Sequence, residues 1–386
     1  MKVLVLTRST GEGHNHVAQA LRDAFAARGH DCDVLDALRV ADAGVELVDP
    51  GVSEHRANPA QSDVASRLYG WAALKMPALF GAAYNLGDVY SRTRVPSPIR
   101  FHNSRFAEAT QAYIELHRYE VIVATHLFPQ ATLSTIRHRH PSAVRFYGVL
   151  TDYTCSPFFT EPRLDGYFIP HPDMMAECVR RGLPRDWTYA VGLPISTDFR
   201  PRESSAPARA ELELAVDRPL TLVMSGGVGS LFIGEACDQL LAYGGQRTQV
   251  VVLTGRREDL YAAITKRYWF DARVTVVPFT DRVADYMAAA DVLVTKPGAV
   301  TTTEAAAMRV PLVHTGAIPG GETKNAAFFA DRGMSVYAQA PREAARLAQW
   351  LSEDPAKVAR MRACQAEHLI TDGAERIVTT IEDRTL

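Results

Sequence analysis

The sequence repeats one structural plan twice. An apolar segment of strand length is followed by a glycine-rich turn and a helical pattern, first at residues 2–7 and again at residues 220–224. After each start, short apolar segments alternate with helical patterns, which is typical of a parallel sheet wound with helices. We therefore expect an α/β protein with two doubly wound domains. Ligands in such folds bind at the carboxyl ends of the strands, so we expect them in a cleft between the domains.

Strand and helix patterns also set the expected domain boundaries. The strands expected in the first half are residues 2–7, 33–35, 121–124, 146–151 and 166–169, with helices at about 129–138 and 173–181. Those expected in the second half are residues 220–224, 250–253, 274–277, 292–295 and 311–315, and helices continue from residue 341. Prolines, serines and charges between residues 193 and 219 are typical of a linker. We therefore predict an N-terminal domain at 1–195, a linker at 196–218 and a C-terminal domain at 219–372, with a last helix at about 373–386 that packs back on the first domain.

The composition is that of a globular enzyme. The 386 residues exceed one ordinary core, which agrees with two domains. The chain carries 42 basic and 44 acidic residues, and this near-neutral balance argues against nucleic acid as a partner. Its five cysteines lack C-x-x-C spacing, which indicates free thiols in a reducing compartment and no metal site. No segment approaches the ~20 apolar residues that span a bilayer, so we expect a cytoplasmic protein whose contact with the cytoplasmic membrane is peripheral.

A glycine turn, three hydroxyls and a carboxylate accompany the start of a helix at residues 294–304. We expect the backbone N–H groups of Thr301 to Thr303 to be unpaired first-turn donors, and the helix dipole favours an anion beside them. Glu304, one position deeper, is placed to reach a vicinal diol such as a ribose. The alternative is an ordinary helix cap, because threonine is a good N-cap residue.

Two further glycine turns follow predicted strands. The loop with Gly226, Gly227 and Gly229 is able to cradle a phosphate, and the turn at residues 319–325 brings a carboxylate and an amide that are able to bond sugar hydroxyls. Alone, each turn is equally explained by a helix cap. Together with the segment at residues 294–304, they favour a ligand site.

His14 follows the first strand, in a loop whose glycines permit close backbone approach. His126 and Asp152 each stand at the end of an expected strand, where they either face the cleft or are satisfied polar residues at a loop start. A dinucleotide-binding fingerprint is the weaker reading of the His14 loop, because His16 replaces its third glycine. His14 and His16 diverge on a helix, so no metal is expected there.

An aromatic and basic stretch lies between the second strand and residue 105. Aromatic rings with interleaved cations suit a bilayer interface, where arginines meet anionic lipid. The alternative is a packed insertion on the first domain. The residues expected to contact acceptor or membrane are Tyr69, Trp71, Lys75, Phe80 and Tyr84.

Taken together, these motifs resemble the family of monogalactosyldiacylglycerol synthases and processive diacylglycerol glucosyltransferases, within glycosyltransferase family 28. The resemblance covers nearly the whole chain, and the order and spacing of the motifs are more specific than any one of them. The motifs are Gly-x-Gly-His (11–14), Thr-His-x-x-Pro (125–129), Thr-Asp-Tyr-Thr-Cys-x-Pro-Phe (151–158), Gly-Gly-x-Gly (226–229), Lys-Pro-Gly-x-x-Thr-x-x-Glu (296–304) and Pro-Gly-x-Glu-Thr-Lys-Asn (319–325).

The resemblance implies a GT-B fold and an inverting transfer of a hexose, glucose or galactose, from a UDP-sugar to a lipid hydroxyl such as that of diacylglycerol. It implies an N-terminal domain that binds acceptor and an anionic membrane surface, and a C-terminal domain that holds UDP. A helix N-terminus and a glycine loop would stabilise the leaving diphosphate, so no cofactor or metal is expected to be obligatory.

Individual residues take roles from the resemblance. His14 becomes the candidate general base for the acceptor hydroxyl, with His126 and Asp152 as the other candidates. Glu304 would hold the ribose, the backbone near Phe279 the uracil, and Thr301 and Thr302 the diphosphate, while Glu322 and Asn325 would read the sugar. The full set expected at the nucleotide-sugar is Gly13, Gly226, Gly227, Gly229, Phe279, Gly298, Thr301, Thr302, Glu304, Gly321, Glu322 and Asn325.

Two departures from the family pattern leave the donor open. Ala299 stands where the family has a second glycine, and Gly255-Arg256-Arg257 stands where it has Gly-x-Asn. Other readings are a UDP-sugar epimerase or hydrolase of the same fold, a transferase with a non-lipid hydrophobic acceptor, and a non-catalytic sensor of UDP-sugar or lipid.

Overall fold

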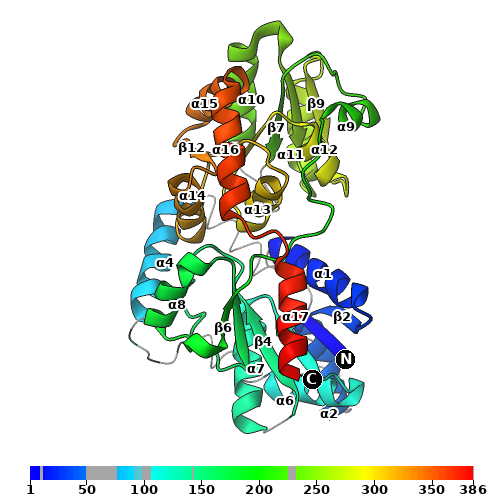
Figure 1. Ribbon diagram of the computed structural model, residues 1–386, viewed down its shortest axis with the longest axis vertical. Coiled ribbons are helices and arrows are strands. Elements are labelled where there is room, and N and C mark those ends of the chain that lie inside the picture. The colour runs from blue at the N-terminus through cyan, green and yellow to red at the C-terminus, as the bar shows by residue number, and fades with distance from the viewer. Residues whose placement is uncertain are drawn as a thin grey trace. The chain divides into compact units, whose positions relative to one another are not determined.

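The chain forms two compact units in this computed structural model, which describes residues 1–8, 12–48, 76–91, 93, 95, 97, 106–140, 143–224 and 232–385 (Figure 1). Unit 1 contains Met1–Ser196 and Ile370–Leu386, and unit 2 contains Thr197–Leu369. Each unit holds a six-stranded parallel sheet with helices packed against it. This confirms the predicted α/β class with two wound sheets.

The sheet of unit 1 has the strand order β2-β1-β3-β4-β5-β6. Consecutive residues Val3, Leu4 and Val5 have no exposed surface, so both faces of the sheet are covered there, as in other parallel sheets. The strands are β1 (Lys2–Thr7), β2 (Asp31–Asp36), β3 (Val121–Ala124), β4 (Arg145–Val149), β5 (Gly166–Ile169) and β6 (Thr188–Ala190). The helices are α1 (Glu12–Ala27), α2 (Ala37–Val48), α4 (Pro77–Ser91), α6 (Ala107–His117), α7 (Leu127–Arg139), α8 (Met175–Arg181) and α17 (Gly373–Thr385), with short 3₁₀ helices η1 (Pro172–Met174) and η2 (Arg185–Trp187).

The sheet of unit 2 has the order β12-β11-β10-β7-β8-β9. Its core lies between the sheet and helices such as α10 and α15, and it includes the buried side chains of Val223, Leu240 and Val252. The strands are β7 (Leu220–Met224), β8 (Gln249–Leu253), β9 (Val274–Val277), β10 (Val292–Thr295), β11 (Leu312–His314) and β12 (Val336–Tyr337). The helices are α9 (Ala206–Glu211), α10 (Ile233–Gly244), α11 (Glu258–Arg267), α12 (Val283–Ala289), α13 (Ala299–Ala307), α14 (Gly321–Asp331), α15 (Pro341–Glu353) and α16 (Pro355–His368), with the 3₁₀ helix η3 (Gly245–Arg247).

The last helix, α17, packs on unit 1 beside α1 (Figure 1). Glu382 bonds the guanidinium of Arg28 and accepts from Nε2 of His30 at 2.8 Å. Nδ1 of His30 lies 3.2 Å from the N-terminal amine of Met1. The two ends of the chain are therefore held together on one unit.

The segment expected as a linker contains α9 and packs against unit 2. Arg209 of α9 is only 4% exposed. Its guanidinium donates to the carbonyl of Ala289 and pairs with Asp291, each at 2.8 Å. A buried arginine that is fully engaged in this way fixes the segment to the body of the unit. No helix within the described ranges is both long and apolar enough to cross a bilayer.

Candidate active site

The three candidate catalytic residues of unit 1 follow neighbouring strands, at the carboxyl edge of the sheet. Strands β1, β3 and β4 are adjacent and parallel, and their carboxyl ends lead to His14, His126 and Asp152. The rings of His14 and His126 meet edge to face, with centroids 4.6 Å apart. The charge of Asp152 is close enough to raise the pKa of His14. The three residues form one cluster, which we call the histidine cluster.

His14 has a defined tautomer. Its Nδ1 lies 2.8 Å from the carbonyl oxygen of Thr125, which only accepts, so Nδ1 carries the proton and donates. The hydroxyl of Thr151 lies 3.3 Å from the same nitrogen. Nε2 of the neutral ring is then the basic nitrogen. Burial lowers the pKa of His14, while Asp152 and the bond to Thr125 oppose that shift. The ring is therefore a neutral base at neutral pH.

His126 has a structural task. It is the N-cap of α7, and its Nδ1 accepts the backbone N–H of Phe128 at 3.1 Å. Burial, His14 and Arg8 hold the pKa of His126 well below its ordinary value. Since the cap occupies the basic nitrogen, the geometry favours His14 over His126 as a general base. The cap also explains why α7 begins at Leu127, two residues before the expected start.

Asp152 lies half-buried in the loop after β4. Its Oδ2 accepts from the hydroxyl of Ser156 at 3.4 Å. A carboxylate beside His14 stabilises the imidazolium that forms when the ring takes a proton. Asp152 is therefore placed to act as an electrostatic partner of His14.

In unit 2, α13 begins earlier than the sequence predicted. Its N-cap is Gly298, and the N–H of Thr302 donates to the Gly298 carbonyl at 3.0 Å. The expectation that the Thr302 N–H is an unpaired donor is therefore wrong. The first-turn donors, which have no partner inside the helix, are instead those of Ala299, Val300 and Thr301. The potential anion site lies at these three groups.

The hydroxyls of Thr302 and Thr303 face the interior. Both residues are 0% exposed. Thr302 Oγ1 lies 3.2 Å from Nε2 of His314 at the end of β11, and Thr303 Oγ1 donates to the Ala299 carbonyl at 2.7 Å. Burial lowers the pKa of His314 to about 3, so its ring is neutral. A diphosphate ligand role for the Thr302 side chain disagrees with this burial, because its hydroxyl holds α13 to the sheet.

An ion pair and a hydrogen bond join the segment before α13 to the first turns of α14. Nζ of Lys296 lies 2.5 Å from Oε1 of Glu322, whose Oε2 accepts from the N–H of Ile318 at 2.9 Å. The buried amide of Asn325 donates to the Pro297 carbonyl at 3.2 Å. Glu304, 3% exposed, lies on the second turn of α13. Sequence reasoning did not assign Lys296 to the site, although a lysine directly after a strand was a usable signal.

The loops after β8 and β9 bring Phe279 and Arg256 together. Phe279 is 51% exposed, and the Arg256 guanidinium lies 3.7 Å from its ring centroid. Arg257, the departure from the family asparagine, is the N-cap of α11, but its side chain does not cap the helix. It pairs with Asp259 instead. The position where the family pattern has asparagine is thus the N-cap of α11 in this chain.

The other expected residues divide into those outside the described part of the chain and those on helices of it. Gly226, Gly227, Gly229, Tyr69, Trp71 and Lys75 lie outside the described residues, as does the side chain of Phe80. Gly13 lies in the first turn of α1, Gly321 is the first residue of α14, and Tyr84 is half-buried on α4.

Helix α4 presents an apolar stripe to solvent. Leu79, Leu86 and Val89 are 59%, 71% and 61% exposed. The opposite side is anchored by Asp88, which pairs at 2.5 Å with Arg181 of α8. Exposed apolar side chains at helical spacing on an anchored helix are typical of a surface that meets a partner or a membrane. We call these three side chains the α4 stripe.

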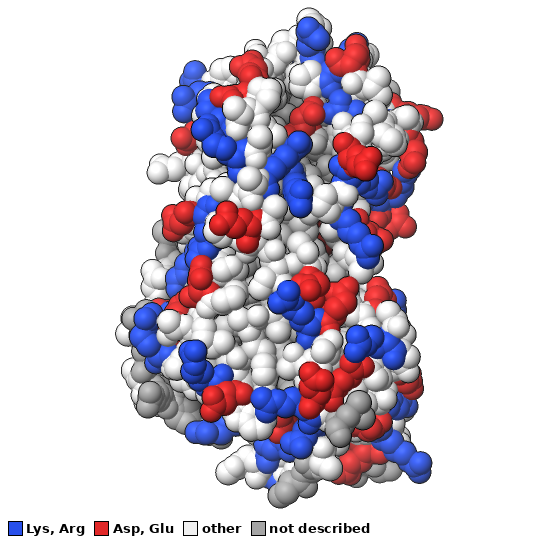
Figure 2. Space-filling model, in the orientation of Figure 1, with Lys and Arg blue, Asp and Glu red and all other residues white. Residues whose placement is uncertain are grey.

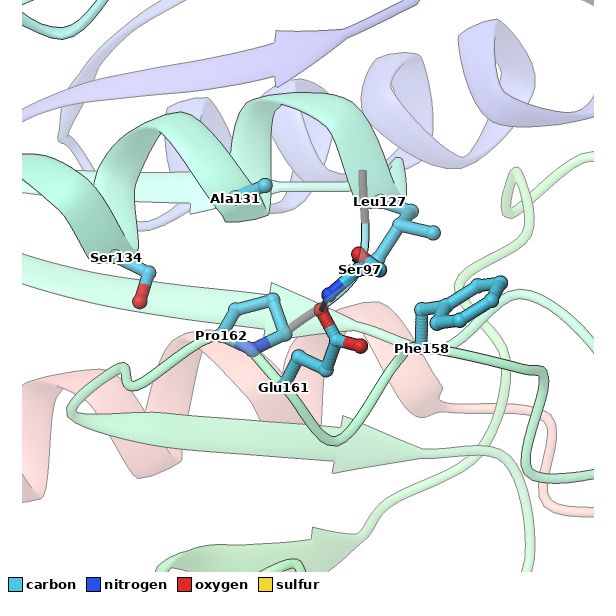
Figure 3. A pocket seen from close by; sticks show the side chains of 7 residues that line it. All are labelled: Ser97, Leu127, Ala131, Ser134, Phe158, Glu161 and Pro162. Atoms are coloured by element: carbon cyan, nitrogen blue, oxygen red, sulfur yellow. Dashed lines mark hydrogen bonds between the residues drawn. The ribbon is translucent and has the colours of Figure 1, made fainter. Parts of the chain in front are cut away.

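A small pocket lies beside the start of α7 (Figure 3). Leu127, Ala131 and Ser134 of α7 face Phe158 and Pro162 across it. Ser97 Oγ donates to Oε2 of Glu161 at 2.7 Å. The pocket volume is ≈ 10 Å³, room for a single water molecule. It is too small for an acyl chain in this state.

Charges are interspersed over the visible surface. On the face in Figure 2, basic and acidic side chains alternate without a large patch of one sign. Within the described ranges, no three His, Cys, Asp or Glu side chains come together as metal ligands.

Two family models match the chain, one within each half. Residues 52–195 match "Monogalactosyldiacylglycerol (MGDG) synthase", and residues 221–377 match "Glycosyltransferase family 28 C-terminal domain". A processive diacylglycerol beta-glucosyltransferase of Bacillus licheniformis is 23% identical over 99% of this chain and 95% of the relative. One from Staphylococcus carnosus is 28% identical over 61% of this chain and 60% of the relative.

Solved structures share the fold at low identity. MurG of Acinetobacter baumannii aligns with a TM-score of 0.60 at 16% identity, over 99% of both chains. Anabaena Alr3699/HepE in complex with UDP aligns with a TM-score of 0.58 at 11% identity, over 100% of both chains. These likenesses show that the chain has the GT-B fold.

Proposed function

We propose that this chain, which belongs to glycosyltransferase family 28, transfers a hexose from a UDP-sugar to the hydroxyl of diacylglycerol with inversion at the anomeric carbon. The observation that carries the proposal is the His14 ring, whose Nδ1 is tied to Thr125 so that Nε2 is free to take a proton. The match of both halves to the family models supports the reaction class. The names of the relatives support the acceptor.

In this mechanism His14 is the general base. Nε2 removes the acceptor proton as the acceptor oxygen attacks the anomeric carbon, and the bond from that carbon to the diphosphate breaks. Asp152 stabilises the imidazolium that results. Because Nδ1 stays bonded to the Thr125 carbonyl, the ring does not need to reorient during proton transfer.

We place the donor on unit 2. The N–H groups of Ala299, Val300 and Thr301 and the dipole of α13 would bind the diphosphate and stabilise the charge that grows on it. Glu304, on the next turn, would hold the ribose. The remaining proposed contacts on unit 2 are the backbone near Phe279 for the uracil, Glu322 for the hexose, and the glycines Gly226, Gly227, Gly229, Gly298 and Gly321 for close approach. The Asn325 amide is 0% exposed and donates to the Pro297 carbonyl, so the expected hexose contact of its side chain disagrees with this burial.

We propose that the α4 stripe lies in a membrane interface, so that the enzyme works peripherally at the cytoplasmic membrane. A lipid acceptor stays in the bilayer, and the enzyme must therefore reach the surface. Moving exposed leucine and valine side chains out of water lowers the free energy by roughly 25 cal/mol per Å² of apolar surface. The pair of Asp88 with Arg181 on the far side of α4 holds the helix in place, so that the α4 stripe stays exposed.

The test is a product assay. Purified protein is incubated with a panel of UDP-sugars and diacylglycerol vesicles, and products are identified by mass. We expect a diacylglycerol that has gained one or more hexoses with one of the donors. Release of free hexose or an epimerised UDP-sugar, with no glycolipid from any donor, would instead identify a hydrolase or an epimerase.

A further inference from the structure

We infer that Lys296 is a further binding and catalytic residue of the donor site, whose ammonium contacts the diphosphate of the nucleotide-sugar and stabilises the leaving UDP. The inference rests on the proposed function, and it gives a chemical role to the first residue of the motif at 296–304, to which the resemblance assigned none. It follows from the placement, burial and pairing of this lysine.

Lys296 lies where the diphosphate is proposed to bind. It follows β10 directly and stands two residues before Gly298, the N-cap of α13. The Gly298 N–H donates to the Lys296 carbonyl at 2.8 Å, which fixes the turn between strand and helix. Two residues span about 7 Å at most, so the lysine backbone lies within that distance of Gly298, the N-cap that precedes the first helical turn. Strand β10 is central in the sheet, between β7 and β11.

The side chain is pre-organised and nearly buried. Lys296 is 8% exposed, and its Nζ lies 2.5 Å from Oε1 of Glu322. The other oxygen of Glu322 accepts the Ile318 N–H at 2.9 Å, so backbone fixes the carboxylate and the carboxylate fixes the ammonium. A nearly buried ammonium is costly unless it is paired. An ammonium has three N–H donors, so it is able to hold Glu322 and a phosphate oxygen together.

The chemistry requires a positive charge at this place. When the anomeric carbon–oxygen bond breaks, its electron pair goes to the diphosphate oxygen, and the acceptor oxygen forms the new bond to that carbon. The first turn of a helix supplies the equivalent of about half a positive charge, whereas a lysine supplies a whole one. A fixed cation that faces developing charge in a water-poor site lowers the barrier to leaving. Because the Lys296 ammonium bonds Glu322 and the phosphate together, Glu322 also stays at the position proposed for the hexose.

The experiment compares ligands with and without the diphosphate. Binding of UDP and of uridine is measured by calorimetry for the wild type and for Lys296→Met, which keeps chain length and removes charge. We expect Lys296→Met to lose about 10- to 100-fold in UDP affinity, the range of a charge-assisted hydrogen bond, with uridine affinity unchanged. We also expect its kcat to fall. Unchanged UDP affinity, or an equal loss for UDP and uridine, would overturn the inference.

Two further variants separate binding from structure. Glu322→Gln keeps the lysine and removes the carboxylate that competes for its ammonium, so UDP affinity should stay equal or rise. A loss of UDP affinity as large as that of Lys296→Met would show that the ion pair is structural, and it would overturn the inference. Lys266→Met, at an exposed lysine near the end of α11, is the matched control and should leave both ligands unaffected. If the wild type binds neither UDP nor uridine, the proposed function is wrong. If the wild type and Lys296→Met bind UDP equally well, only the inference about Lys296 is wrong.

Discussion

At the scale of single residues, His14 controls the pH dependence of turnover. Burial lowers its pKa from the ordinary 6.5, and a base must be neutral to act. Turnover should therefore rise with pH through the lowered pKa and stay level above it, so that the acid limb of kcat lies below pH 6.5. Asp152→Asn removes a charge that raises this pKa, and the limb should move to still lower pH. A limb that moves to higher pH, or His14→Ala with wild-type turnover, would contradict this role.

His126 offers the matched comparison at the same scale. Asparagine is a preferred N-cap residue, so His126→Asn preserves the cap of α7 but removes a possible base. We expect this variant to keep most of its turnover, whereas His14→Asn should lose most of it and still bind UDP. Steady-state kinetics and calorimetry on both proteins check the expectation. Loss of turnover by folded His126→Asn would transfer the base to His126.

At the scale of elements, the start of α11 shows a departure from the family pattern with a physical consequence. Arg257 occupies the N-cap but forms a pair with Asp259 that is partly exposed, and such pairs contribute about 0–1 kcal/mol. An asparagine cap contributes typically ~1 kcal/mol. We therefore expect Arg257→Asn to leave stability unchanged or to raise the Tm of unit 2 slightly in calorimetry. A clear fall in Tm would show that the ion pair outweighs the cap.

The α4 stripe makes a second prediction at this scale. Leu86→Ser combined with Val89→Ser removes two exposed apolar side chains, so vesicle flotation should weaken while the thermal transition stays unchanged. Leu116→Ser, at a side chain of α6 that is 60% exposed, is the control and should float like the wild type. Flotation that survives the double substitution would place the membrane contact elsewhere.

At the scale of the whole molecule, α17 completes unit 1 from the far end of the sequence. Its side chains of Ile377, Val378 and Ile381 are 0% exposed. Each contributes roughly 1.5–3 kcal/mol, and their sum is comparable to the stability of a domain, about 5–15 kcal/mol. A chain ending at Leu369 should therefore lose the transition of unit 1 in calorimetry and keep UDP binding by unit 2. Ile381→Ala should lower the Tm of unit 1, the exposed Glu375→Ala should not, and a truncated chain with both transitions intact would contradict the prediction.

The sequence predicted what depends on long apolar patterns. Strands buried on both faces, such as β1 and β7, read as continuous apolar runs, and the fold class was confirmed. The short edge strands β6 and β12 were missed, because two or three residues carry no period. The start of α13 was predicted too late, since Gly298 caps it through backbone geometry rather than a side chain. Tertiary contacts decided the tasks of His126 and Thr302, and no local pattern encodes those contacts.

The meeting of the two chain ends on unit 1 has a consequence for how this protein can be rearranged. A single imidazole, that of His30, bridges the N-terminal amine and Glu382 of the last helix. A short flexible linker is enough to join ends that lie this close. The joined chain could then be opened between Ser196 and Thr197, where it first passes from one unit to the other. In such a permuted order, each unit would be continuous in sequence. Helix α17 would come shortly before β1, whereas it now lies at the opposite end of the chain from that strand.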